Sequence, residues 1–361
     1  MKKLTTLFLL FIATAVFSQA GAPAPYYNNF NWNLTGNPLK NALATKITTT
    51  HTNYLSYSEV WNATKITDLD PSNSNNVLLI YGWENGTDSD ATNDISRNKN
   101  SNGGNNGQWN REHVYAKGLG TPELNDGGSS DAGEDAHHLR SSDVQRNNSR
   151  GSLRFASGSG NSGPVSGGWY PGDQWKGDVA RMMMYMYLRY PEQCLPKNVG
   201  ALNSATVSTD TNMIQLFLQW NAEDPVSPYE DARNTYHGGT GTYAQRNRNP
   251  FIDNPYLATV IWGGPVAENR WPNVFLSSGD FQLLSNVIVY PNPATSQRIN
   301  IQSEITLDNI QLININGQLI QEIKKPTPTN NTYSVENLSQ GFYLLRLSSD
   351  NQTVTKKVIV N

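Results

Sequence analysis

Trp109-Asn-Arg-Glu-His-Val114 opens the stretch of sequence that predicts the fold. A loop rich in Gly, Ser and Asp follows, and the chain then reads Asp135-Ala-His-His-Leu-Arg140 and Ser141-Ser-Asp-Val-Gln-Arg-Asn-Asn-Ser-Arg150. The two histidine-containing runs suit short strands, and the last run suits a helix. Ser142 or Asp143 is the expected N-cap of that helix, because either side chain can accept from a free backbone N–H. The predicted order is strand, loop, strand, helix.

Residue types that suit phosphodiester hydrolysis gather in this stretch. The reaction needs an activated water, neutralisation of charge on the phosphate, and help for the leaving oxygen. His113 is the expected general base, because the pKa of imidazole lies near neutrality. Glu112 and Asn147 offer oxygen donors that suit a divalent cation, with Mg²⁺ expected and Mn²⁺ or Ca²⁺ as alternatives. Arg150 is expected to hold a phosphate.

Other interpretations of these residues stay open at this point. Neighbouring residues of an ideal strand point to opposite sides, so Glu112 and His113 share one site only if the backbone bends. A Glu-His pair is a weak signal by itself, and His113 and His137 would then be hydrogen-bonded structural residues. Zinc would use His113, His137 and Asp135, but the chain has neither an HExxH motif nor a pair of cysteines.

The net charge of the chain restricts how it can bind nucleic acid. A formal net charge of −3 at pH 7 argues against a broadly basic surface. An enzyme that engages a few phosphates around a cation needs only a local positive field. Contacts to nucleic acid are therefore predicted at arginines from two local clusters, namely Arg140 and Arg146 from one and Arg246 and Arg248 from the other.

The N-terminus is typical of an exported protein. Lys2 and Lys3 precede an apolar run from Leu4 to Phe17, and small residues follow, so we expect a signal peptide over residues 1–20. The run is shorter than the roughly 20 residues of a membrane span, which disfavours an anchor. Cys194 is the sole cysteine and is expected to be buried and unbridged.

Periodicity predicts a mixed helical domain over residues 21–265. Val77–Tyr81 suits a buried strand, and residues 84–107 suit a surface loop. Helices are expected from Asp178 to Arg189, near Met213 to Trp220, and from a cap at Ser227. A linker is expected over residues 266–285.

Residues 286–361 show short alternating apolar runs separated by turn residues. The expected strands are Ile299–Ile301, Ile310–Ile315, Tyr343–Leu347 and Val354–Val360, which predict a small β-sandwich. This segment has no histidine and no acidic cluster, so we expect it to serve in binding, anchoring or targeting.

Beyond local chemistry, the motif Trp-Asn-Arg-Glu-His-Val, with Asp-x-His-His-Leu-Arg and Asn-x-x-Arg, resembles the bacterial endonuclease I family. These are extracellular and periplasmic nucleases with a ββα-metal (His-Me finger) site. Further blocks agree in order, and they are Gly177–Tyr187, Trp220–Val226, Glu230–Asn234 and Gln245–Asp253. The resemblance covers about Tyr26 to Gly264.

That resemblance implies roles for single residues. His113 matches the general base, Glu112 and Asn147 match the metal ligands, and Arg150 matches the arginine after the ligand asparagine. Asp135 and His137 match positions expected to orient the site by hydrogen bonds.

The chain also departs from the family pattern. It reads Tyr115–Gly118 where Trp-Pro-Lys-Ser is common, and Leu139–Ser142 where Leu-Arg-Pro-Ser is usual. No arginine lies between Gly118 and Glu134, so the residue that stabilises the product phosphate stays open.

The C-terminal segment resembles the sorting domain of the type IX secretion system. The resemblance rests on Tyr290-Pro-Asn-Pro293, Ile315-Asn-Gly-Gln318, Leu338–Leu344 and the closing Lys356–Val360. It implies contact with the type IX machinery and delivery outside the cell or to the cell surface. A generic adhesion module is the alternative.

The sequence therefore predicts an α+β protein with a nuclease domain and a C-terminal β-sandwich. The expected activity is metal-dependent endonucleolytic hydrolysis of DNA, with RNA as a further candidate substrate, by a secreted monomer without a stable membrane span. A secreted adhesin or glycan-binding protein with structural histidines, and a phosphodiesterase for small substrates, are the alternatives.

Overall fold

A computed structural model describes residues 22–23, 25–128, 131–272, 274–275, 287–349 and 352–361. It divides into two compact units, Met1–Val274 and Phe275–Asn361. The predicted signal peptide and most of the predicted linker lie outside the described residues. The first unit extends past residue 265, because Arg270 pairs with Asp231 at 2.7 Å and Trp271 packs on Tyr27.

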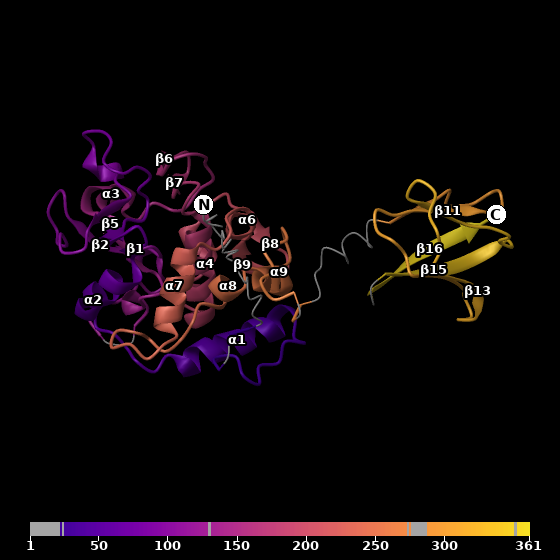
Figure 1. Ribbon diagram of the computed structural model, residues 1–361, viewed down its shortest axis with the longest axis horizontal. Helices are drawn as coiled ribbons and strands as arrows, with labels where there is room; N and C mark the ends of the chain where they lie inside the picture. Colours follow the sequence, from indigo (N-terminus) through magenta and orange to yellow (C-terminus); the bar gives the residue numbers. More distant parts are fainter. Residues whose placement is uncertain (1–21, 24, 129–130, 273, 276–286, 350–351) are drawn as a thin grey trace, which may run out of the picture. The chain divides into compact units, whose positions relative to one another are not determined.

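The first unit is built around one buried helix, α4 (Lys176–Arg189), which contacts α1, α6 and α8 (Figure 1). Twelve of its fourteen residues are buried, including the four methionines, so the helix supplies the core. The other helices are α1 (Gly36–Thr50), α2 (Tyr57–Thr67), α3 (Val144–Arg150), α5 (Pro196–Val199), α6 (Gln215–Glu223), α7 (Pro228–His237), α8 (Pro250–Asp253) and α9 (Tyr256–Trp262). The predicted helices near residues 178–189 and after Ser227 are thus confirmed, and Ser227 and Glu230 form a capping box.

Short antiparallel strands complete this unit. One sheet has three strands in the order β1 (Leu69–Asp70), β2 (Asn73–Leu78), β3 (Ser96–Asn98). The remaining strands form two-stranded sheets, which are β4 (Trp109–His113) with β5 (Leu139–Asp143), β6 (Gly163–Val165) with β7 (Gly168–Tyr170), and β8 (Thr206–Val207) with β9 (Asp210–Ile214). The segment 84–107, predicted as a loop, contains β3 and the 3₁₀ helix η1 (Ala91–Asn93). Cys194 is buried and unbridged, as predicted.

The strand, loop, strand, helix order predicted around the histidines is confirmed. Trp109 pairs with Asp143 and His113 with Leu139 along the β4–β5 ladder, and α3 begins directly after β5. Asp143 is the N-cap of α3, since its carboxylate accepts from the backbone N–H groups of Gln145 and Arg146. The loop between the strands contains two further 3₁₀ helices, η2 (Lys117–Leu119) and η3 (Ala132–Glu134).

The second unit is an antiparallel β-sandwich, as predicted. One sheet has the order β10 (Ile288–Tyr290), β11 (Ile299–Gln302), β14 (Thr332–Val335), and the other β13 (Leu319–Lys324), β12 (Asn309–Asn314), β15 (Gly341–Ser349), β16 (Gln352–Val360). Both sheets contribute to one core, for example Ile301 and Tyr333 from the first and Leu345 and Val358 from the second. In the part of the chain that the structure describes, no helix combines the length and the apolar character needed to cross a bilayer.

Candidate active site

The β4–β5–α3 unit brings the three central predicted residues to one cavity. Its volume is about 180 Å³, and its lining includes Glu112, His113, Asn147 and Arg150 together with residues from β4, η2 and the end of α3. Glu112 and His113, the last two residues of β4, both line this cavity, although neighbouring residues of an ideal strand point to opposite sides.

Glu112 is buried and held through one of its two oxygens. The Tyr81 hydroxyl donates to Oε1 over 2.9 Å, and Nη1 of Arg150 lies 3.1 Å from the same oxygen. Burial raises the pKa of Glu112 to about 7, against the opposing effects of Arg150 and the Tyr81 hydrogen bond. Tyr81 has a φ of 75°, which is unusual for a bulky residue, at the position that directs its hydroxyl to Glu112. These contacts leave Oε2 as the oxygen available to a ligand.

Asn147 is oriented by a second amide. Its Nδ2 donates to Oδ1 of Asn110 over 2.8 Å, which leaves its own Oδ1 as an acceptor. One carboxylate oxygen and one amide oxygen are hard donors of the kind that Mg²⁺ and Ca²⁺ prefer. A cation held by Glu112 and Asn147 would take its remaining ligands from water and phosphate, as Mg²⁺ usually does.

The alternative zinc set is not assembled. Within the described residues, no group of three or more His, Cys, Asp or Glu side chains is placed to hold a metal ion. His113, His137 and Asp135 therefore do not form the site that was considered from the sequence.

His113 is held as a neutral imidazole with one nitrogen committed. Its Nε2 lies 2.8 Å from the carbonyl oxygen of Gly133, so Nε2 carries the hydrogen and Nδ1 is the basic nitrogen. Burial, and then His138 whose ring centroid lies 5.6 Å away, keep the pKa of His113 well below its usual value. The ring stacks on Tyr57 at 5.3 Å. This arrangement suits a base that accepts a proton from water.

Arg150 is less free than its sequence position suggests. Its side chain is 1% exposed, and it donates to the carbonyl oxygens of His113 and Val114 over 2.9 and 2.8 Å, besides contacting Glu112. The guanidinium thus fixes the end of β4 and the carboxylate. This geometry favours a positioning role over the predicted contact with phosphate.

Asp135 and His137 lie outside the cavity lining. Asp135 accepts from Tyr185 over 2.9 Å and from Gln245 over 3.0 Å, while Nε2 of His137 lies 3.1 Å from the side-chain oxygen of Asn247. The backbone N–H of Asp135 donates to the carbonyl of Ala132, which links this network to η3, the helix that carries Gly133. His138, the neighbour of the predicted residue, is the histidine beside His113.

A buried histidine next to this network gives a prediction for stability. His237 is fully buried with neither ring nitrogen hydrogen-bonded among the described residues, and burial holds its pKa well below the usual value. The unfolded chain takes up a proton there below about pH 6.5 while the folded chain does not, so stability is present above that pH and falls as the pH drops. Between pH 6.5 and pH 5 this proton uptake should lower the free energy of unfolding of the wild type by about 2 kcal/mol, and His237→Phe should not show that decrease.

Denaturant unfolding of both proteins at the two pH values measures this difference, and the other titrating groups cancel because both chains share them. Equal losses in the two proteins would show that His237 is protonated in the folded state.

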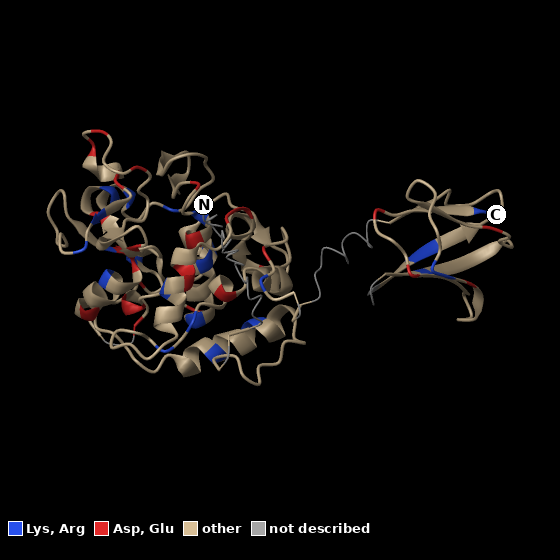
Figure 2. Ribbon diagram, in the orientation of Figure 1, with Lys and Arg blue, Asp and Glu red and all other residues tan. Residues whose placement is uncertain are grey.

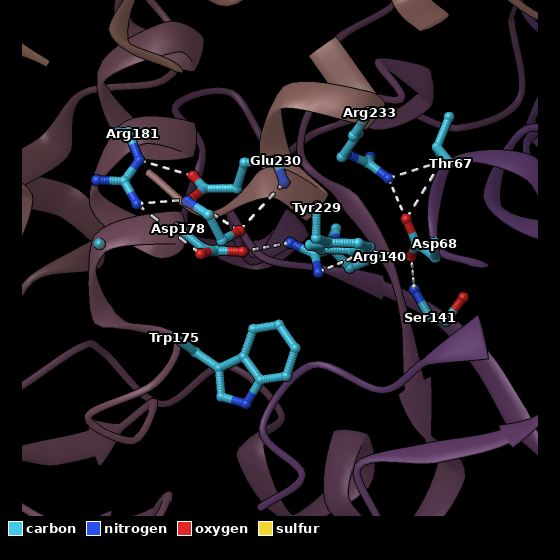
Figure 3. Close-up of polar contacts among 12 residues, drawn as sticks. Thr67, Asp68, Arg140, Ser141, Trp175, Asp178, Arg181, Tyr229, Glu230 and Arg233 are labelled. Atoms are coloured by element: carbon cyan, nitrogen blue, oxygen red, sulfur yellow. Dashed lines mark hydrogen bonds and ion pairs between the residues drawn. The ribbon is translucent and has the colours of Figure 1, made fainter. Parts of the chain in front are cut away.

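The structure contradicts the prediction made for Arg140. It was expected to contact nucleic acid, but it is fully buried and contacts Asp68, Asp178 and Tyr229 (Figure 3). The same network contains Arg181 paired with Glu230, and Arg233 paired with Asp68. Although Arg140 pairs with Glu112 along the β-ladder, tertiary contacts with α4 and α7 remove its charge from the surface.

The other predicted arginines do not line the cavity. Arg146 lies 4.4 Å over the Trp83 ring, Arg246 donates to the carbonyl of Gly239, and Arg248 pairs with Asp253. Figure 2 shows Lys and Arg interspersed with Asp and Glu on the first unit. Contacts of Arg146, Arg246 and Arg248 with nucleic acid stay predictions.

Four residues near the site were not singled out from the sequence, namely Tyr57, Tyr81, Asn110 and Lys117. Asn110 could have been found, because it lies two residues before Glu112 in the same strand. Tyr81 offers no local signal, since it reaches Glu112 across 31 positions of the chain.

Comparison with known proteins adds family matches to this geometry. A family model described as Endonuclease I matches residues 35–256, and one described as Secretion system C-terminal sorting domain matches residues 288–361. A protein named "Extracellular ribonuclease" from Bacillus subtilis (strain 168) is 42% identical over 265 residues, which is 69% of this chain and 84% of that protein.

Two further similarities are of unequal weight. A protein of the same name from Bacillus amyloliquefaciens is 40% identical over 272 residues, which is 72% of this chain and 84% of that protein. A solved structure of PorZ, from the type-IX secretion system of Porphyromonas gingivalis, covers 23% of this chain and 12% of that one with 17% identity and a TM-score of 0.19. That score is too low to support an argument about the fold.

Proposed function

Because this chain belongs to the endonuclease I family, we propose that it hydrolyses the phosphodiester bonds of both DNA and RNA with a divalent cation and without sequence specificity. Family membership and the sorting domain make the protein a secreted nuclease, at the cell surface or outside the cell. The observation that carries the proposal is the meeting of Glu112, His113 and Asn147 in one cavity.

In this mechanism His113 is the general base. Nδ1 accepts a proton from the attacking water, while the Gly133 carbonyl fixes the other nitrogen and stabilises the imidazolium that forms. The low pKa of His113 means that the ring is already neutral before it accepts the proton. Tyr57 stacks on the ring and limits its rotation.

Glu112 and Asn147 would hold the cation through Oε2 and Oδ1. When bound, such an ion neutralises charge on the phosphate and helps the 3′ oxygen to leave. Tyr81 and Arg150 keep the Glu112 carboxylate in place. Asn110 accepts from Nδ2 of Asn147, which leaves Oδ1 of Asn147 free for the cation.

The range of substrates follows from the identity of the nucleophile. A water-activating base needs no 2′-hydroxyl on the substrate, so the same residues can act on DNA and RNA. The relatives named as ribonucleases support the RNA part. The cavity offers groups suited to a phosphate and a cation, which supports action without reading bases.

The test uses supercoiled plasmid, a single-stranded RNA and a small phosphodiester, each with Mg²⁺ and with EDTA. We expect cleavage of both nucleic acids with Mg²⁺, and at least about 100-fold slower cleavage in EDTA, because the ion supplies several kcal/mol of stabilisation and 1.36 kcal/mol corresponds to a factor of ten.

Cleavage of RNA alone would contradict the water-based mechanism, and full activity in EDTA would contradict the cation. Fast turnover of only the small ester would favour the phosphodiesterase alternative. Glu112→Gln is the matched variant, since it removes the charge with little change of shape and should raise the Mg²⁺ concentration for half-maximal activity.

A further inference from the structure

We propose that Lys117 is the residue that binds a substrate phosphate in this cavity, and that Asp126 holds its ammonium group when no substrate is present. The inference rests on the proposed function and names a phosphodiester anion as the ligand. Lys117 begins η2, four residues after His113, and lines the same cavity as Glu112, His113 and Asn147.

Among the residues that the structure describes, three cationic side chains line the cavity, and two of them are bound to other protein groups. Arg150 is buried, with its donors directed to β4 carbonyls and Glu112. The guanidinium of Arg111 lies 3.5 Å from the Tyr57 ring and 4.2 Å from the Trp61 ring, and it donates to the backbone carbonyl of Tyr57. Both arginines therefore fix the walls of the site.

Lys117 differs from these arginines in exposure and in its partner. Its side chain is 37% exposed, and Nζ lies 2.6 Å from Oδ2 of Asp126, whose side chain is 28% exposed. Exposed ion pairs of this kind contribute little, about 0–1 kcal/mol. A phosphate can therefore replace the carboxylate at small cost, and the four-carbon stem of lysine lets the ammonium move between the two anions.

Asp126 follows a residue that packs closely against η3. Gly133 lies so close to Asn125 that a Cβ on it would be 2.2 Å from the Asn125 carbonyl oxygen. The segment that carries Asp126 is thus packed against the residue whose carbonyl holds His113. Because the carboxylate of Asp126 is paired with Lys117, it competes with any anion for that ammonium, and it also acts electrostatically on Tyr57 and Arg111.

The experiment measures binding without turnover. A short fluorescein-labelled single-stranded DNA is titrated in Ca²⁺ into the full chain carrying His113→Ala, and then into the same chain with Lys117→Met, Lys117→Arg or Asp126→Asn. Lys117→Met should weaken binding about tenfold and lower the slope of log affinity against log salt by about 0.7, the value for one phosphate contact on a single strand. Lys117→Arg should keep most of the affinity.

Asp126→Asn should tighten binding up to about fivefold, because it removes the competing anion. In the Lys117→Met background the same change should have a clearly smaller effect, which is the signature of a coupled pair. Lys99→Met, a lysine that donates to the Ser74 carbonyl and does not line the cavity, is the matched control and should leave binding unchanged.

Unchanged affinity and salt slope in Lys117→Met would overturn the inference, and so would equal effects of Asp126→Asn with and without Lys117. Cleavage assays separate this failure from that of the proposed function. If His113→Ala abolishes cleavage while Lys117→Met has wild-type affinity and rate, the nuclease mechanism stands and the phosphate assignment fails.

Discussion

Replacement of His113 by alanine is expected to lower kcat on plasmid DNA and on RNA by about 10²–10⁴-fold, the range that general-base catalysis contributes. Nδ1 of His113 is the imidazole nitrogen that is left to accept a proton, because Nε2 is bonded to Gly133. Glu112 is not expected to substitute for it, since Tyr81 and Arg150 hold Oε1 and the proposed cation would occupy Oε2.

The measurement is single-turnover cleavage at saturating Mg²⁺, with the thermal midpoint recorded for each protein. Added imidazole should restore part of the rate, which a purely structural histidine would not allow. His237→Phe is the matched histidine control, as it does not line the cavity and should keep full activity at pH 7. Full activity of His113→Ala would show that another group removes the proton.

Replacement of Arg140 by leucine is expected to lower the free energy of unfolding by about 3–5 kcal/mol, because it takes from buried Asp178 its nearest cationic partner and leaves buried Asp68 with Arg233 alone. Nη1 of Arg140 lies 3.0 Å from Asp178, and Nε lies 3.5 Å from Asp68, with no exposure on the arginine side chain. Denaturant unfolding of the first unit measures the loss.

Two variants test that interpretation. Lys176→Ala breaks a partly exposed pair with Glu223 at the start of α4 and should cost under about 1 kcal/mol. Adding Asp178→Leu to Arg140→Leu should recover part of the lost stability, since an apolar pair needs no desolvation of charge. Under conditions where Arg140→Leu is folded, oligonucleotide binding should equal wild type. A selective loss of binding without loss of stability would restore the role predicted from the sequence.

Much of the site follows from residues that are close in the chain. Asp143 caps α3 through its own next residues, and the short runs around His113 and Leu139 pair as strands. These features depend on local hydrogen bonding and on alternation, which a sequence states directly. Family resemblance supplied what local rules could not, namely that Glu112 and His113 face one cavity despite being neighbours in a strand.

The sequence by itself predicted the ββα unit and the separate C-terminal sandwich, and it singled out Glu112, His113 and Asn147, which the structure places in one cavity, because capping, periodicity and motif order are local properties. Only the tertiary structure decided which charged side chains are buried against protein partners and which are exposed to solvent. Arg140 and Arg150 are as polar in sequence as Lys117, yet the first two are buried against distant carboxylates and carbonyls, while Lys117 is held by one exposed carboxylate. Burial depends on partners far away in the chain, such as Asp178 for Arg140, and no local pattern records them.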